Sequence, residues 1–383
     1  MAFNSRAPMK VSDLNMVIAV AAGDYHTVAL KWDGTLAAWG YNGYGQLGDG
    51  SVFQRTTPVE VTGLCEVAAV AAGYGHSVAL KKDGTVWVWG YNGIGQLGDG
   101  STIQRTIPVQ VIGLDGIAAI TAGDYHTVAL KKDGTVWAWG DNDFGQLGDG
   151  STIRRVAPAA VPGLDEVAAI AAGDYHTVAL KNDGTVWAWG DNGIGQLLQG
   201  SRGQKSTPSQ IPGLSGIVAI AAGYGHTVAL KNDGTLWSWG DNGIGQLGDG
   251  TFTNRATPVQ VVGLSGMVAI AVGDYHTVAM KSDGTLWSWG YNGFGQLGDG
   301  RTTNRPAPVQ VSGLNGITAF SAGNYHTVAL KNDGSVWSWG YNGVGQLGTN
   351  VGREPAPAEE FISPAALNYD NHAAQQFANQ MAA

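Results

Sequence analysis

Hydrophobic positions along this chain alternate with polar or small ones in short runs, with a period of two rather than 3.6. Within residues 67–111 the alternation predicts strands at 67–72 (VAAVAA), 76–81 (HSVALK), 85–90 (TVWVWG) and 108–111 (PVQV). The Asp83-Gly84 pair between the second and third strands predicts a type I′ hairpin, and the connection from the third to the fourth is long and rich in glycine. The pattern indicates a unit of four short antiparallel strands.

This unit recurs at a constant spacing. One glycine of each copy marks the period of 50 residues: Gly23, Gly73, Gly123, Gly173, Gly223, Gly273 and Gly323. A repeat of this size cannot bury its apolar face alone, so neighbouring copies must stack. Seven copies of four antiparallel strands predict an all-β fold, a seven-bladed β-propeller with 50 residues per blade.

Side-chain size supports radial blades, whose faces converge toward an axis. The first strand of each repeat is rich in alanine, as an innermost strand requires, whereas the third carries paired tryptophans such as Trp187 and Trp189. Residues at i and i+2 point to the same face of a strand, so we expect each pair to pack against the neighbouring blade. The fourth strand opens with a proline such as Pro108, which an outermost edge strand tolerates.

The propeller is expected to span residues 1–362. The N-terminal segment PMKV (8–11) matches the fourth strand of the repeat better than PAEEF (357–361) does, so it should complete the last blade beside residues 335–340. Residues 363–383 begin with a Ser-Pro pair suited to a helix start, and they predict a short helical tail outside the propeller.

Composition narrows the class of partner. A net charge of −9 and a pI near 5.2 disfavour nucleic acid and anionic membranes, both of which need a basic face. The single cysteine, Cys65, excludes an internal disulfide framework. No apolar run approaches the ~20 residues of a membrane span, and the first residues lack the layout of a signal peptide. Cytoplasmic residence is therefore the default expectation; a secreted form lacking its leader would look the same.

One face of the disc should carry the variable residues, because the turn between the first and second strands and the loop between the third and fourth emerge on the same side. The turns contribute Asp24, Tyr25, Tyr74, Asp124, Tyr125, Asp174, Tyr175, Tyr224, Asp274, Tyr275 and Tyr325. The loops begin with Tyr41, Tyr91, Asp141, Asp191, Asp241, Tyr291 and Tyr341. Tyrosine offers rigid contact area with a polar tip, so this ring is a candidate protein-binding face of exposed turn residues. The alternative is that each tyrosine only packs over its own blade.

A histidine opens the second strand of every repeat: His26, His76, His126, His176, His226, His276 and His326. On separate blades these side chains lie too far apart to share a metal ion, and no nucleophile accompanies them. We expect each imidazole to satisfy backbone groups between blades.

Other candidate chemistry is weak. The stretch DNDFG (141–145) has calcium-loop spacing but no closing acidic residue. Five Asp/Arg pairs recur within the long loops and predict ion pairs: Asp49/Arg55, Asp99/Arg105, Asp149/Arg155, Asp249/Arg255 and Asp299/Arg305. The fourth repeat breaks this pattern at 197–206, either by drift or because it marks a functional sector. We therefore expect no enzyme activity, no cofactor and no metal.

The string HTVALKNDGTVWAWGDNGIGQL (176–197) resembles the repeat of the regulator of chromosome condensation family. The resemblance covers nearly the whole chain and implies a seven-bladed propeller; the near-identical, indel-free repeats are typical of a bacterial member. Members of the family include a nuclear guanine-nucleotide exchange factor, a plant ultraviolet-B photoreceptor and a bacterial inhibitor of β-lactamases. The expected function is a non-enzymatic protein-binding scaffold or inhibitor, with nucleotide exchange on a small GTPase as the alternative. Photoreception is disfavoured, because the turns carry Asp-Tyr or Tyr-Gly in place of the sensing tryptophans.

Overall fold

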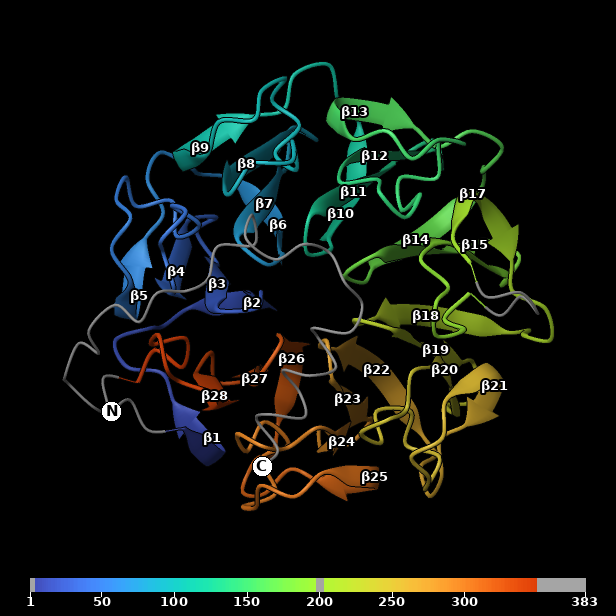
Figure 1. Cartoon of the computed structure of the whole chain (residues 1–383). Coiled ribbons are helices and arrows are strands. Elements are labelled where there is room, and N and C mark those ends of the chain that lie inside the picture. Colours follow the sequence, from blue (N-terminus) through green and yellow to red (C-terminus); the bar gives the residue numbers. More distant parts are fainter. Residues whose placement is uncertain (1–3, 198–202, 350–383) are drawn as a thin grey trace.

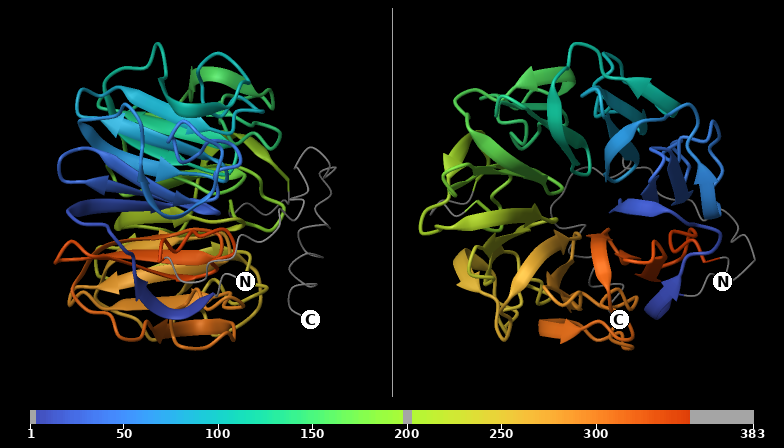
Figure 2. Two further views of the ribbon diagram at one scale, coloured as in Figure 1. Left: turned by 90° about the vertical axis from the view of Figure 1, so that its left-hand side faces the viewer. Right: turned by 180° about the vertical axis from the view of Figure 1, so that it is seen from behind.

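The computed structural model describes residues 4–197 and 203–349, which form seven four-stranded antiparallel sheets arranged around a central axis (Figure 1). Side and rear views show the sheets as blades of one disc (Figure 2). Within the described ranges every regular element is a strand. The prediction of an all-β, seven-bladed propeller with four strands per blade is confirmed. None of the described residues forms a helix long and apolar enough to cross a bilayer.

In six blades the strands follow one another outward from the axis in chain order, and in the seventh the outermost strand is the first strand of the chain. The innermost strands are β2 (Val17–Ala22), β6 (Val67–Ala72), β10 (Ile117–Ala122), β14 (Val167–Ala172), β18 (Ile217–Ala222), β22 (Met267–Val272) and β26 (Ile317–Ala322). The second strands are β3 (His26–Lys31), β7 (His76–Lys81), β11 (His126–Lys131), β15 (His176–Lys181), β19 (His226–Lys231), β23 (His276–Lys281) and β27 (His326–Lys331). The third strands are β4 (Leu36–Gly40), β8 (Val86–Gly90), β12 (Val136–Gly140), β16 (Val186–Gly190), β20 (Leu236–Gly240), β24 (Leu286–Gly290) and β28 (Val336–Gly340). The outermost strands are β5 (Arg55–Glu60), β9 (Arg105–Gln110), β13 (Arg155–Ala160), β17 (Lys205–Gln210), β21 (Arg255–Gln260), β25 (Arg305–Gln310) and β1 (Ser5–Lys10). We number the blades 1 to 7 from β2.

The apolar core lies between blades. In one such cluster Val28 and Leu30 of blade 1 pack with Trp89 of blade 2, and all three side chains are buried. The indole nitrogen of Trp89 donates to the main-chain oxygen of Gln46 in blade 1 at 2.8 Å. Its partner in the tryptophan pair, Trp87, is half-buried and packs on the edge of the same cluster. The predicted packing of the tryptophan pairs against the neighbouring blade is therefore confirmed.

The hairpin between the second and third strands differs from the prediction. A type I′ turn needs a positive φ at both central residues, but Gly84 has φ of 85° and Asp83 does not share that conformation. Asp83 Oδ1 accepts hydrogen bonds from the main-chain nitrogen and hydroxyl of Thr85 at 2.9 and 2.7 Å. These bonds hold Asp83 at a negative φ, so the loop is a right-handed turn followed by one glycine in the left-handed conformation.

The outermost strands begin earlier than predicted. Strand β9 starts at Arg105, so Pro108 lies inside it rather than at its first residue. The pairing of β8 with β9 shifts register between Val88 and Gly90, which marks a bulge in β9 that includes the proline. A bulge on an edge strand accommodates a residue that has no main-chain donor.

The N-terminal strand closes the ring. Strand β1 pairs antiparallel with β28, with Met9 opposite Ser338, and so becomes the outermost strand of blade 7 (Figure 1). The main-chain nitrogen of Val11 then donates to the oxygen of Val336 at 2.8 Å. Val11 and Leu14 are buried beside Trp39 of blade 1, so the first and last blades share one core. The predicted tail at 363–383 and the alternative closing segment at 357–361 lie outside the described residues.

A closed circle of side-chain hydrogen bonds links the second strands. The Nε2 atom of each histidine lies 2.8 to 3.1 Å from a hydroxyl oxygen of the next blade, which belongs to the serine or threonine directly after the histidine of that blade. His326 of blade 7 contacts Thr27 of blade 1 in the same way and so closes the circle. The Thr127 hydroxyl, which faces His76, donates its own proton to the main-chain oxygen of Gln96. It can therefore only accept from His76, whose Nε2 must carry the proton. The histidines join blades as expected, but through hydroxyls rather than directly to the backbone.

The geometry also explains the first glycine of the repeat. A Cβ atom on Gly23 would lie 2.4 Å from the main-chain oxygen of Gly73 and 2.6 Å from the ring of His26. The innermost turns and the histidine circle thus approach too closely for any side chain at this position.

Replacement of Thr127 by valine should destabilise the propeller by about 1–3 kcal/mol, because the methyl group leaves the buried Nε2 of His76 without a partner. The Gln96 carbonyl loses one of its two hydrogen bonds and keeps the one from the Trp139 indole. Denaturant unfolding of the purified chain measures this loss. Ser77→Thr is the matched control, since it keeps the hydroxyl that His26 contacts and introduces the residue found in the other blades. Equal stability of Thr127→Val and wild type would contradict an energetic role for the circle.

Candidate functional site

The inner turns and the long loops lie on one face, as their aromatic contacts demonstrate. Tyr44, from the long loop of blade 1, has its ring centroid 4.8 Å from that of Tyr91 and 6.3 Å from that of Tyr74. In blades 6 and 7, Tyr275 stacks on Tyr325 at 5.8 Å with an interplanar angle of 18°. The structure therefore brings the predicted tyrosines together in groups of ring contacts that extend over neighbouring blades.

These tyrosines are less exposed than predicted. Tyr125 is buried, with 7% of its surface exposed, and the other predicted tyrosines are half-buried. Each ring covers its neighbours, so truncation of a turn tyrosine removes packing as well as surface. Burial raises the pKa of Tyr74 far above its usual value, so its hydroxyl stays protonated.

Three contributors were missed by the sequence reasoning: Tyr44, Phe144 and Phe294, which pack among the predicted tyrosines. The signal was available, because the position directly before Gly-Gln-Leu is large and apolar or aromatic in every repeat: Tyr44, Ile94, Phe144, Ile194, Ile244, Phe294 and Val344.

The first residues of the long loops divide the face into two arcs. The tyrosine arc consists of Tyr41, Tyr91, Tyr291 and Tyr341 from blades 1, 2, 6 and 7, which are consecutive around the closed ring. The acidic arc consists of Asp141, Asp191 and Asp241 from blades 3, 4 and 5. The sevenfold repetition is broken at this position, which sets an aromatic sector opposite an acidic one.

Each aspartate of the acidic arc also has a structural partner. Gln146, Gln196 and Gln246 donate through Nε2 to Asp141, Asp191 and Asp241 at 2.8–2.9 Å. Where the loop begins with tyrosine, the corresponding buried Nε2 atoms have no partner in the described part of the chain: Gln46, Gln96, Gln296 and Gln346. The acidic arc is thus held in place by its own loops.

The predicted ion pairs hold the long loops, and all five are confirmed at 2.7 Å. Burial would raise the pKa of Asp49, but hydrogen bonds from Ser51 and Arg55 outweigh it and hold the pKa below its usual value. In the candidate calcium loop, Asp141 and Asp143 instead contact the guanidinium of Arg154 at 3.1 and 2.5 Å. A cation there would compete with an arginine. The irregular loop at 197–206 lies partly outside the described residues, so its role as a functional sector stays a prediction.

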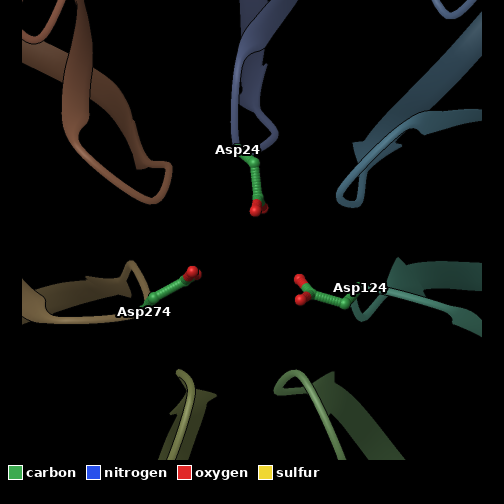
Figure 3. A group of neighbouring side chains, drawn as sticks. All are labelled: Asp24, Asp124 and Asp274. Carbon is green, nitrogen blue, oxygen red and sulfur yellow. The ribbon is translucent and has the colours of Figure 1, made fainter. Parts of the chain in front are cut away.

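The aspartates of the inner turns point into the central channel rather than outward. Figure 3 shows Asp24, Asp124 and Asp274 converging from three blades, and carboxylate oxygens of all three lie within 4.8 Å of one another. Asp174 shares a hydrogen bond with Asp124. The carboxylates stand at the mouth of a cavity of about 320 Å³ walled by the innermost strands. Sequence reasoning placed them on the docking face, because spacing along the chain does not reveal where turns meet around an axis.

Burial dominates the electrostatics of these carboxyls. It raises the pKa of Asp24 to about 7, which a hydrogen bond from Asn324 only partly offsets. Burial also raises the pKa of Asp124, Asp174 and Asp274, and the neighbouring aspartates add to the effect. Near neutral pH the channel mouth therefore holds protons or attracts a cation.

Comparison with known proteins agrees with the fold. A model of the RCC1-like domain matches residues 2–266 and 163–378. The human protein WBSCR16 superposes with a TM-score of 0.77 at 23% identity, covering 85% of this chain and 90% of that one. Prp20p of Saccharomyces cerevisiae, whose structure was described with its binding to Gsp1p and histones, superposes with a TM-score of 0.73 at 25% identity. The match covers 85% of this chain and 82% of that one. The same yeast protein bound to Kap60 superposes with a TM-score of 0.73 at 24% identity. Because the family model spans nearly the whole repeat array, this chain belongs to the family of RCC1-like domains.

Proposed function

We propose that this protein is a non-enzymatic scaffold or inhibitor that binds a partner protein on the face formed by the tyrosine arc and the acidic arc. The observation that carries the proposal is the split of one loop position into two contiguous arcs, because selection for blade packing alone would treat all seven blades alike. The partner should present an apolar patch to the tyrosines and basic side chains to the acidic arc.

The physical character of the tyrosine arc supports recognition. Rings that pack against one another, such as Tyr41 on Tyr44 at 5.8 Å, lose little conformational entropy when a partner covers them. The half-buried tyrosines still expose part of their side-chain surface to a partner. The acidic side chains and a net charge of −9 favour approach by a basic partner. The yeast relative Prp20p is itself described as binding proteins.

Replacement of Tyr41, Tyr91 and Tyr291 by alanine together should weaken partner binding at least about a hundredfold, because aromatic anchors each contribute about 1–3 kcal/mol. These three lie on the long loops and are less buried than the inner Tyr125. The partner is first identified by capture from the native organism, and affinity is then measured by calorimetry with purified proteins.

Trp32→Ala is the matched control, since this exposed aromatic residue sits in a hairpin on the opposite face. Its affinity should equal that of wild type. The proposal would be contradicted if the triple variant kept its affinity for the partner and Lys132→Ala, in a hairpin on the opposite face, lost it. The partner would then bind the opposite face.

Nucleotide exchange on a small GTPase is the second candidate, favoured by the 25% identity to Prp20p, a protein described as binding Gsp1p. Release of a fluorescent guanine nucleotide from a candidate GTPase, with and without catalytic amounts of this chain, tests it. Acceleration of release would support exchange; binding without acceleration would leave the scaffold as the function.

A further inference from the structure

We propose that the mouth of the central channel is a calcium site formed by Asp24, Asp124, Asp274 and Asn324. This inference does not depend on the proposed protein binding. The donors come from the same position of the inner turns in blades 1, 3, 6 and 7. In blades 2 and 5 this position is tyrosine, so oxygen donors are not a general feature of the repeat.

The distances suit a single ion. Carboxylate oxygens of the three aspartates all lie within 4.8 Å of one another and project toward one point on the axis (Figure 3). Three ligands spaced evenly around one ion are separated by about 1.7 times the metal–oxygen distance, about 4.0–4.5 Å for Ca²⁺ and about 3.5–3.6 Å for Mg²⁺. The turns therefore need little movement to coordinate Ca²⁺ and more contraction to coordinate Mg²⁺.

Asn324 supplies an independent indication of a ligand. Its side chain is buried, with 7% exposed, and its amide nitrogen lies 3.3 Å from Asp24 Oδ2. That contact directs the amide nitrogen toward the carboxylate cluster, and the amide oxygen, Oδ1, has no hydrogen-bond partner among the described residues. A buried carbonyl oxygen without a partner is costly. Rotation of the amide about χ2 would exchange its nitrogen and oxygen, so that Oδ1 could coordinate a cation held by the carboxylates.

The negative charge of the carboxylate cluster also favours a bound cation. Carboxylates that face each other in a largely buried site repel, and they must either take up protons or bind a cation. Asp174 adds a further carboxyl that shares a hydrogen bond with Asp124. All donors are oxygen atoms, which hard divalent cations prefer, and the cavity of about 320 Å³ leaves room for water to complete six to eight ligands.

The test uses the full chain, stripped with a chelator and then titrated with CaCl₂ by calorimetry. We expect one Ca²⁺ per chain and weaker binding of Mg²⁺. Tyr25, Tyr125 and Tyr275 directly follow the ligands, so Tb³⁺ in place of Ca²⁺ should luminesce on tyrosine excitation. Calcium at about one hundred times its dissociation constant should raise the melting temperature by about 3 °C.

The double variant Asp24→Asn/Asp274→Asn should weaken binding at least about a hundredfold, because two charged ligands become neutral. It should fold, since asparagine occupies the same position in blade 7, and in chelator it should melt above wild type because fewer carboxylates repel. Asp233→Asn/Asp283→Asn removes the same charge from two exposed hairpins and should bind Ca²⁺ as wild type does.

Asn324→Ala tests the amide oxygen without touching a carboxylate, and should weaken binding about tenfold. The proposal is overturned if the stripped wild-type chain binds no Ca²⁺ in one-to-one ratio. It is equally overturned if the Asp24/Asp274 variant, or Asn324→Ala, keeps wild-type affinity.

Discussion

Deletion of residues 1–14 should lower the melting temperature by about 10 °C or more, because it removes the strand that closes the ring together with two core side chains. Without β1, the outer edge of β28 loses its hydrogen-bond partner. Val11 and Leu14 leave the cluster that they share with Trp39, which opens the core between blades 7 and 1. Calorimetry or a circular dichroism melt measures the change.

Deletion of residues 1–3 alone is the control, since it spares β1, and it should leave the melting temperature within about 1 °C of wild type. An unchanged melting temperature after the longer deletion would mean that another segment can replace β1 in blade 7. The candidate in the sequence is 357–361.

Acidification below pH 6.5 should unfold the propeller steeply, because seven buried histidines are neutral in the fold. Burial lowers the pKa of His26, His126 and His226 to about 3 from 6.5, and the others shift in the same direction. Between these two values the unfolded chain binds more protons, so stability falls as pH falls. Each histidine contributes about 1.4 kcal/mol per pH unit within this window.

The aspartates at the mouth of the central channel have the opposite effect on stability when the pH falls. The folded pKa of Asp24 is raised to about 7 from 3.8, so between those values the folded state binds more protons and gains stability as pH falls. Asp124, Asp174 and Asp274 shift in the same direction. Four such groups oppose seven histidines, so in chelator the free energy of unfolding should have its maximum near pH 6.5 and decline below it.

Denaturant unfolding at pH 7, 6, 5 and 4.5 measures this profile. In His126→Gln the free energy of unfolding should depend less steeply on pH below pH 6. The difference should correspond to the uptake of about one proton fewer on unfolding, because one titrating group is gone. A free energy of unfolding that stays constant from pH 7 to 4.5 would contradict the neutral, buried histidine circle.

The sequence by itself determined the architecture. A period of 50 residues without an insertion, alternation with period two and alanine-rich first strands leave few folds other than a seven-bladed propeller. These features are local, so each repeat carries them in full. The Asp/Arg pairs were equally readable, because both partners lie within one loop, six residues apart.

Only the tertiary structure decided the details that arise between blades. The turn at Asp83 is a local exception, because hydrogen bonds from Thr85 within the same hairpin outweigh the usual preference of an Asp-Gly pair. The burial of Tyr125 results from the rings of Tyr74 and Tyr91, which the neighbouring blade 2 contributes. Asp24 and Asp274 are 250 residues apart in sequence, yet ring closure brings their carboxylates within 4.8 Å. A repeat specifies which side chain each turn carries; the distance between turns exists only after the ring has closed around its axis.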